Sequence, residues 1–96
     1  MNAIQILYSK EVIDGILLEM IAWRLPVAVL GCSHQFKYRF YAGRLDGTCL
    51  VRYDNERGKG DHKHVGDIQE PYCFTTLVNL KNDFMQDVIK MTKEQK

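Results

Sequence analysis

The stretch "FKYRFYAGRLDGTCLVRYD", from Phe36 to Asp54, decides the fold of the first half of the chain. An Asp-Gly pair at positions 46–47 separates two runs in which apolar and polar side chains alternate. Such a pair favours a two-residue type I′ turn, because this turn needs positive φ at both central residues. One face of the hairpin is then apolar and the other polar, which is typical of a sheet with one solvated face. The predicted cross-strand pairs are Phe40 with Tyr53, Ala42 with Val51, Tyr41 with Arg52, and Arg39 with Asp54.

The chain upstream of this hairpin repeats the pattern. An Asp-Gly pair at positions 14–15 lies between "AIQILYSKEVI" and "ILLEMIAWRL", so another hairpin is predicted there. The segment "PVAVLGCSH" joins the two hairpins and contains Pro26 and Gly31, so we interpret it as a connection that a partner could contact. The register of the upstream hairpin pairs Ile13 with Ile16, Lys10 with Glu19, Tyr8 with Ile21, and Ile6 with Trp23.

A helix is predicted at the end of the chain, after the short extended segment "EPYCF". Thr75 or Thr76 can cap this helix. Its apolar residues recur with helical spacing and form a stripe that can pack on the apolar face of the sheet: Leu77, Leu80, Phe84, Val88 and Met91. The sequence therefore predicts a single domain over residues 1–96. Its fold class is α+β, with an antiparallel sheet of about four strands, made of two hairpins, packed against a C-terminal helix.

The composition excludes several classes of protein. A net charge of +1, from 13 basic and 12 acidic residues, gives no general attraction to nucleic acid. The cysteines have neither a disulfide framework nor a zinc-site spacing, so we interpret Cys32, Cys49 and Cys73 as small apolar side chains in a reducing compartment. Neither a signal peptide nor a membrane-spanning stretch is expected, and the sequence predicts a cytoplasmic protein.

Residues 54–67, "DNERGKGDHKHVGD", depart from both periodic patterns. Gly58, Gly60 and Gly66 stand there among charged and histidine residues. Glycine adopts positive φ easily and lets the backbone approach a ligand closely. We interpret this stretch as a functional loop that presents cations and backbone N–H groups to phosphate.

The longer segment "RYDNERGKGDHKHVGDIQEPYCF", followed by a helix containing "NDFMQDV", resembles the TumE family of toxins from toxin–antitoxin modules. Two positions depart from the typical family pattern: Lys63 stands where arginine is usual, and Gln69 stands where an acid is common. No catalytic role is therefore assigned to Gln69. The resemblance implies a cytoplasmic toxin that stops growth and is neutralised by a co-expressed helix-turn-helix antitoxin. It does not define the chemistry, and ribonuclease action is inferred by analogy with other small toxins.

Metal-independent cleavage of RNA needs a base for the 2′-hydroxyl, a cation for the phosphorane and an acid for the leaving oxygen. His62 and His64 are the candidates for base and acid, because histidine titrates near neutral pH. Arg57 is the candidate for charge stabilisation, and Glu56 is a further acid–base candidate. The candidates for binding RNA or phosphate are Lys59, Lys63, Arg52 and Tyr72.

Other interpretations of the ionisable residues are less favoured. Asp54 is interpreted as a structural partner of Arg39, from the predicted register. A nucleophilic pair of Cys32 and His34 would lack a third group to orient it. No metal and no cofactor are predicted, because the one candidate set lacks the usual zinc-site spacing: Asp61, His62, His64 and Asp67.

The leading hypothesis is a growth-arresting toxin that acts on RNA as a ribonuclease resembling mRNA interferases. The alternative is a non-enzymatic module whose basic segment 54–67 docks onto RNA, a ribosome or another protein. A toxin that transfers a nucleotidyl or other group is a third hypothesis. The expected partners are a helix-turn-helix antitoxin and an RNA or ribosomal target, and a homodimer remains open.

Overall fold

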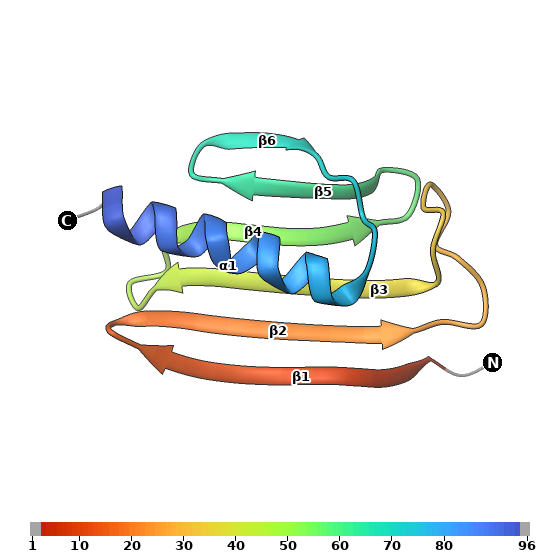
Figure 1. The fold of residues 1–96 in the computed structure, drawn as a ribbon, viewed down its shortest axis with the longest axis horizontal. Coiled ribbons are helices and arrows are strands. Elements are labelled where there is room, and N and C mark those ends of the chain that lie inside the picture. The colour runs from red at the N-terminus through yellow and green to blue at the C-terminus, as the bar shows by residue number, and fades with distance from the viewer. Residues whose placement is uncertain (1–2, 95–96) are drawn as a thin grey trace.

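The computed structural model describes residues 3–94 and shows one antiparallel sheet with a helix lying along it (Figure 1). The strands follow one another across the sheet in chain order, and each is hydrogen-bonded to the next. The elements are β1 (Ile4–Ile13), β2 (Ile16–Arg24), β3 (Phe36–Arg44), β4 (Cys49–Glu56), β5 (Gly60–Val65), β6 (Ile68–Pro71) and α1 (Leu77–Glu94). The predicted α+β class is confirmed, but the sheet has six strands rather than about four.

The two additional strands come from the charged segment and the residues after it. The prediction of a loop over residues 54–67 is wrong, because these residues complete β4, turn, and return as β5. Towards the helix, β5 presents Asp61 and Lys63, whose partners are the polar side chains of Tyr38 and Asp87. A strand whose buried contacts are polar lacks the apolar–polar alternation by which strands are found in a sequence.

The β1–β2 hairpin has the predicted turn and most of the predicted register. Asp14 and Gly15 have φ values of 51° and 78°, as a type I′ turn requires. Three of the expected pairs are present: Ile13 with Ile16, Lys10 with Glu19, and Tyr8 with Ile21. The fourth is wrong, because a bulge between Gln5 and Leu7 places Gln5, not Ile6, opposite Trp23.

The β3–β4 hairpin keeps its register although its turn differs from the prediction. Arg44 N donates to Thr48 O at 2.8 Å, so three residues form the turn, with Gly47 at φ 97°. A compensating shift between Ala42 and Gly43 restores the alignment further along the strands. All four predicted pairs are present: Phe40 with Tyr53, Ala42 with Val51, Tyr41 with Arg52, and Arg39 with Asp54.

The core lies between α1 and one face of the sheet. Phe84 of α1 is fully buried, and its ring stands edge-on to Phe40 and Tyr53 at centroid distances of 5.5 and 5.7 Å. Burial of an aromatic side chain of this size stabilises the fold by ~1.5–3 kcal/mol. The helix is capped as expected, because Asn79 N donates to Thr76 Oγ1 at 3.1 Å.

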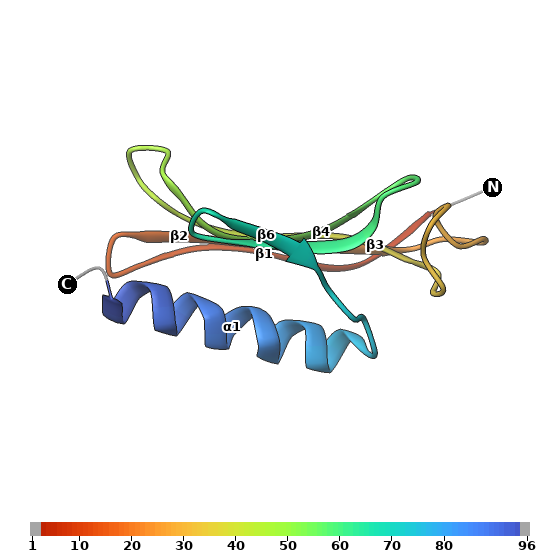
Figure 2. The same ribbon diagram turned by 90° about the horizontal axis from the view of Figure 1, so that it is seen from above.

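The opposite face of the sheet carries no helix among the described residues, as Figure 2 shows with α1 on one side only. The polar residues predicted for this face are half-buried or exposed: Lys37, Arg39, Tyr41, Arg52 and Asp54. Within residues 3–94, no helix is both long and apolar enough to cross a membrane. We call the two sides of the sheet the helix face and the open face.

Candidate functional site

The segment "GDHKH", residues 60–64, is divided between the two faces because side chains alternate along a strand. His62 and His64 lie on the open face, opposite Asp54 and Arg52 of β4 in the register. Asp61 and the following lysine lie on the helix face, where Tyr38 and α1 contact them. Residues that are adjacent in the sequence therefore belong to two separate groups.

We call the group on the open face the open-face cluster, which consists of Arg52, Asp54, Glu56, His62 and His64. Within it, His62 Nε2 lies 2.7 Å from Asp54 Oδ1 and 3.7 Å from Glu56 Oε1. His62 Nδ1 lies 3.1 Å from Gly60 O and donates to this carbonyl, which fixes the ring.

The second histidine of the cluster is in a different electrostatic state. His64 Nε2 lies 2.7 Å from Arg52 Nη2, and a guanidinium can only donate, so this nitrogen accepts. Burial lowers the pKa of His64 below its usual value, and the positive charge of Arg52 lowers it further. His64 is therefore neutral at pH 7, with its other ring nitrogen protonated.

The open-face cluster retains hydrogen-bonding capacity that its own residues do not use. The contact of His62 Nε2 with Asp54 Oδ1 is short but is not aligned as a hydrogen bond. Arg52 Nε lies 3.4 Å from Asp54 Oδ2 and is likewise buried without a hydrogen bond among the described residues. Buried polar atoms are normally hydrogen-bonded, and exceptions are typical of functional sites.

The other predicted site residues are distributed unevenly. Arg57 and Lys59 lie on the exposed β4–β5 turn, at the end of the cluster. Lys63 lies on the helix face, where its Nζ is 3.3 Å from Asp87 Oδ2. Tyr72 also contacts the helix, because its hydroxyl donates to Asp83 Oδ2 at 2.6 Å. The structure therefore brings His62, His64, Glu56 and Arg52 together, but not Lys63 or Tyr72 with them.

Asp54 is the cluster member to which the sequence assigned only a structural role. Its register partner is Arg39, as predicted, but its ion pairs are with Arg52 and His62. Arg39 instead lies 3.5 Å from Glu19 and over the ring of Tyr41. The signal that could have identified Asp54 is the β4–β5 register, which places it opposite His62.

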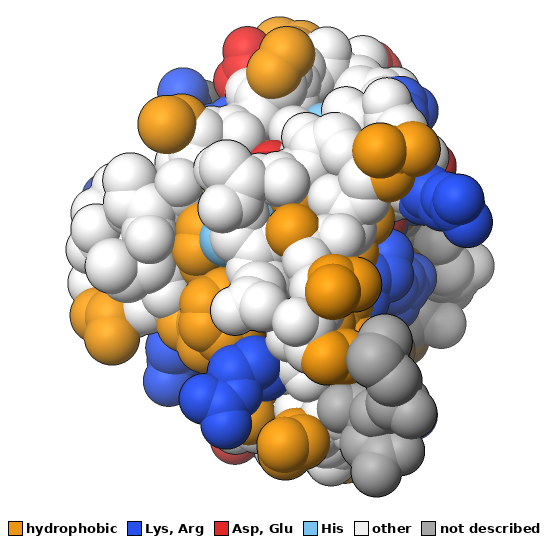
Figure 3. All heavy atoms as spheres, turned by 90° about the vertical axis from the view of Figure 1, so that its right-hand side faces the viewer, with side chains coloured by type: hydrophobic (Ala, Val, Ile, Leu, Met, Phe, Trp, Pro, Cys, Tyr) orange, Lys and Arg blue, Asp and Glu red, His pale blue; other side chains and the backbone are white. Residues whose placement is uncertain are grey.

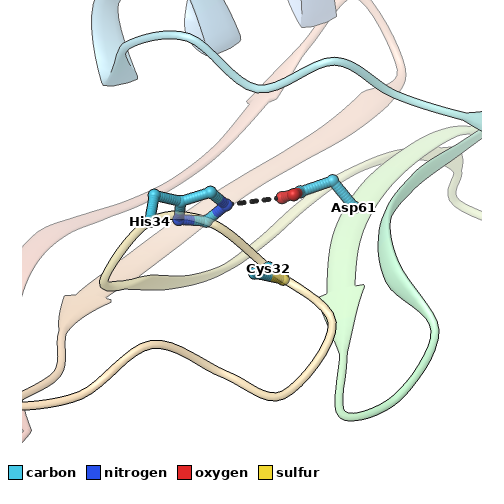
Figure 4. A group of neighbouring side chains, drawn as sticks. All are labelled: Cys32, His34 and Asp61. Carbon is cyan, nitrogen blue, oxygen red and sulfur yellow. Dashed lines mark hydrogen bonds and ion pairs between the residues drawn. The ribbon is translucent and has the colours of Figure 1, made fainter.

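Figure 4 shows a second group of ionisable side chains, on the helix face, with His34 and Asp61 pointing toward each other and Cys32 beside them. Asp61 Oδ1 lies 2.8 Å from His34 Nε2 and accepts from the Tyr38 hydroxyl at 2.6 Å. Phe36 N donates to His34 Nδ1 at 3.1 Å, so the proton of the neutral ring is on Nε2, which donates to Asp61.

This arrangement leaves His34 without a lone pair for a metal ion or for the thiol of Cys32. Burial raises the pKa of Cys32, which disfavours its thiolate. Burial and the Asp61 carboxylate also raise the pKa of Tyr38. The ring of His34 is stacked on Phe74 at a centroid distance of 3.9 Å. The polar side chains of His34, Asp61 and Tyr38 therefore have hydrogen-bond partners within the group, and we interpret the group as structural. The sequence likewise gave little support to a Cys32–His34 nucleophile.

Among the residues that the structure describes, two sets of neighbouring side chains have the residue types of metal ligands: Cys32, His34 and Asp61 on the helix face, and Asp54, Glu56 and His62 on the open face. In the first, both ring nitrogens of His34 already have partners, Asp61 and the Phe36 N–H. In the second, the 2.7 Å between His62 Nε2 and Asp54 Oδ1 is shorter than the ~3 Å between two ligands at ~2.0–2.2 Å from one ion. The two atoms would therefore have to move apart to bind one ion.

A family model described as toxin TumE matches residues 5–92, which is nearly the whole chain. The chain belongs to the TumE toxin family. Comparisons with curated proteins and with solved structures gave no match. Membership of a toxin family implies that the chain has an antitoxin partner.

Proposed function

We propose that this toxin arrests growth by cleaving RNA at the open-face cluster, without a metal ion. The observation that carries the proposal is the pairing of a neutral His64 with the Arg52 guanidinium, next to the close contact of His62 with Asp54. A neutral imidazole, a phosphate-binding cation and a proton donor on one surface are the groups that transesterification of RNA needs.

In the proposed reaction, the RNA phosphate binds Arg52 and draws the guanidinium away from His64 Nε2. The freed lone pair takes the proton of the 2′-hydroxyl, and the 2′-oxygen forms a bond to phosphorus. The bond from phosphorus to the 5′-oxygen breaks, and this oxygen takes up a proton. The products are a 2′,3′-cyclic phosphate and a 5′-hydroxyl end.

The proton for the leaving oxygen comes from the His62 side of the cluster. His62 is only 4% exposed, so it does not itself reach the solvent. The side chain of Glu56 is 52% exposed, and its Oε1 lies 3.7 Å from His62 Nε2, so Glu56 has to move within hydrogen-bond distance of His62 to carry this proton to the leaving oxygen. Asp54 holds the His62 ring in place, and Arg57 and Lys59 attract the RNA backbone from the adjacent turn.

The remaining partners belong to the same proposal. The target is cellular RNA, free or on the ribosome, so the toxin acts in the cytoplasm. The antitoxin is a helix-turn-helix protein that is made from the same module. A homodimer remains a prediction of the sequence.

A binding module that blocks RNA or the ribosome without chemistry is the second candidate function. The exposure of Arg57 and Lys59 on the turn favours it, since these cations can contact phosphate without the histidines. The two functions differ in how they respond to the loss of one side chain. Cleavage fails when one acid–base group is removed, whereas binding weakens by degrees as charges are removed.

The test is an in vitro cleavage assay with end-labelled single-stranded RNA, read for cyclic phosphate ends. The proposal expects cleavage by the wild-type protein and its loss in His64→Ala. Lys90→Ala, an exposed change on α1, is the control for altered surface charge. RNA that is bound but left intact, with binding that falls gradually as cations are removed, would favour the non-enzymatic function.

A further inference from the structure

A cleft opens at the end of the sheet where the β2–β3 connection meets the β4–β5 turn. Its volume is about 600 Å³, and most of its lining is apolar. In Figure 3, which views this end of the molecule, hydrophobic side chains lie at the surface with lysine and arginine side chains beside them. The lining consists of Ala3, residues 25–30, Lys37 and Arg57.

The connection that forms this cleft is held in place by backbone hydrogen bonds. Gly58 N donates to Leu30 O at 2.6 Å, and Leu25 N donates to Gln35 O at 2.7 Å. A Cβ atom on Gly60 would lie 2.9 Å from Gly31 O, so the connection and the turn approach closely enough to require glycine. The glycines of the charged segment therefore allow contact with this connection, and the cleft is formed before any partner binds.

The apolar side chains of the cleft are exposed in the isolated protein. Val27 is 61% exposed and Leu30 is 65% exposed, so both would gain stability from being covered. Arg57, at the edge of the cleft, takes part in none of the ion pairs among residues 3–94. An occupant with apolar side chains next to a carboxylate would complement both features.

We infer that this cleft is the docking site of the antitoxin, and that a short antitoxin segment with apolar side chains and an adjacent Asp or Glu fills it. The cleft holds only a few side chains, so the occupant is a peptide segment rather than a folded domain. An apolar lining suits such a segment better than it suits RNA phosphates. Because Arg57 follows Glu56 directly, a segment bound there also lies at the edge of the open-face cluster.

This inference rests on membership of a toxin family and not on RNA cleavage. Its test uses the product of the neighbouring gene whose co-expression restores growth. Binding of that protein to purified toxin is measured by calorimetry and by association kinetics at several salt concentrations. If no neighbouring product neutralises the toxin, the inference is overturned.

The decisive variants change side chains that are exposed in the free toxin. Val27→Ser with Leu30→Ser should weaken antitoxin binding at least about tenfold, since the double change removes apolar surface that the antitoxin would bury. Arg57→Glu should slow association and reduce its dependence on salt. Leu45→Ser, 68% exposed at the other end of β3, is the apolar control, and Lys90→Glu is the charge control.

Affinity within about twofold of wild type for the Val27→Ser, Leu30→Ser double variant would overturn the inference. So would light scattering that shows the cleft variants dissociating a toxin dimer while antitoxin affinity is unchanged, because a second copy would then be the occupant. RNA cleavage by the double variant is measured in parallel. Weak antitoxin binding with no cleavage even by wild-type toxin would remove the proposed function and leave this inference standing.

Discussion

The two faces of the β4–β5 hairpin use the same kinds of ionisable side chain in opposite ways. On the helix face, Lys63 contacts Asp87, the Tyr53 hydroxyl donates to the same carboxylate, and Asp61 accepts from two donors. On the open face, the His62–Asp54 contact lacks hydrogen-bond alignment, and Arg52 Nε has no hydrogen bond among the described residues. The difference teaches that residue type alone does not mark the candidate site, whereas unused hydrogen-bonding capacity does.

The two faces also differ in what covers them. The helix covers the helix face, and a polar group buried under it without a partner would cost about 1–3 kcal/mol. Three carboxylates there have donors: Asp61 has Tyr38 and His34, Asp87 has Tyr53 and Lys63, and Asp83 has Tyr72. Within residues 3–94 no helix covers the open face, yet Arg52 Nε and His62 Nε2 are buried there without a hydrogen bond, which carries a cost that a bound ligand could relieve.

The largest expected effect is the loss of RNA cleavage when a histidine of the open face is replaced. His64→Ala should reduce RNA cleavage by about 10²- to 10⁴-fold, because it removes a general base. In cells, His62→Ala should relieve growth arrest at least about tenfold for the same reason. Cleavage rates and colony counts measure these effects, with circular dichroism to confirm folding. A folded double variant, His62→Ala with His64→Ala, that remains fully toxic would contradict the histidine mechanism.

The elements that could be predicted are those with an apolar period. The Asp14–Gly15 turn, the β3–β4 register and the stripe through Phe84 followed from turn residues, alternation and helical spacing. The turn at Asp46–Gly47 gained a residue, yet the compensating bulge preserved the pairs beyond it. Local rules therefore sufficed wherever apolar side chains set the contacts.

Strand β5 and part of the candidate site could not be predicted, because they depend on polar contacts that produce no periodic pattern in the sequence. β5 has polar contacts on both faces, so no apolar period reveals it. Without β5 there was no register to place Asp54 beside His62, or Lys63 on the other side of the sheet. The sequence offered one signal for β5: Asp61 and Lys63 alternate with the histidines just after a turn that contains glycine.

The next largest effect concerns the helix face and is expected in stability rather than activity. Asp61→Ala removes the acceptor of the Tyr38 hydroxyl and of His34 Nε2, which should lower the free energy of unfolding by about 1–3 kcal/mol. Asp61→Asn keeps a carbonyl acceptor and should cost less. Urea unfolding measures both. If Asp61→Ala abolished RNA cleavage while its stability stayed unchanged, the groups that cleave RNA would have to be assigned to the helix face.

A smaller effect concerns the pH dependence of cleavage. Burial and Arg52 hold the pKa of His64 below its usual value, so the base is neutral above that pKa and is lost as the pH falls through it. The acid limb of the cleavage profile should therefore lie below the range of an ordinary histidine. Arg52→Gln removes a positive charge and should raise the pKa of His64, whereas Arg52→Lys keeps the charge and should raise it less.

NMR titration of the His64 ring protons measures this shift without relying on activity. His34, which is on the other face and does not contact Arg52, provides the internal control in the same spectra. An unchanged titration of His64 in Arg52→Gln would mean that the guanidinium does not set its protonation state.

The smallest expected effect is that of metal ions, which should be close to none. His62 Nε2 and Asp54 Oδ1 are closer than two ligands of one ion, and Arg52 Nε already places positive charge 3.4 Å from Asp54 Oδ2. A divalent ion would have to separate the first pair and lie beside the guanidinium. Treatment with a chelator should therefore leave both cleavage and the melting temperature unchanged. Stoichiometric zinc or manganese in the purified toxin, lost in Glu56→Gln and accompanied by a lower melting temperature on chelation, would instead assign the unused capacity of the open face to a metal ion.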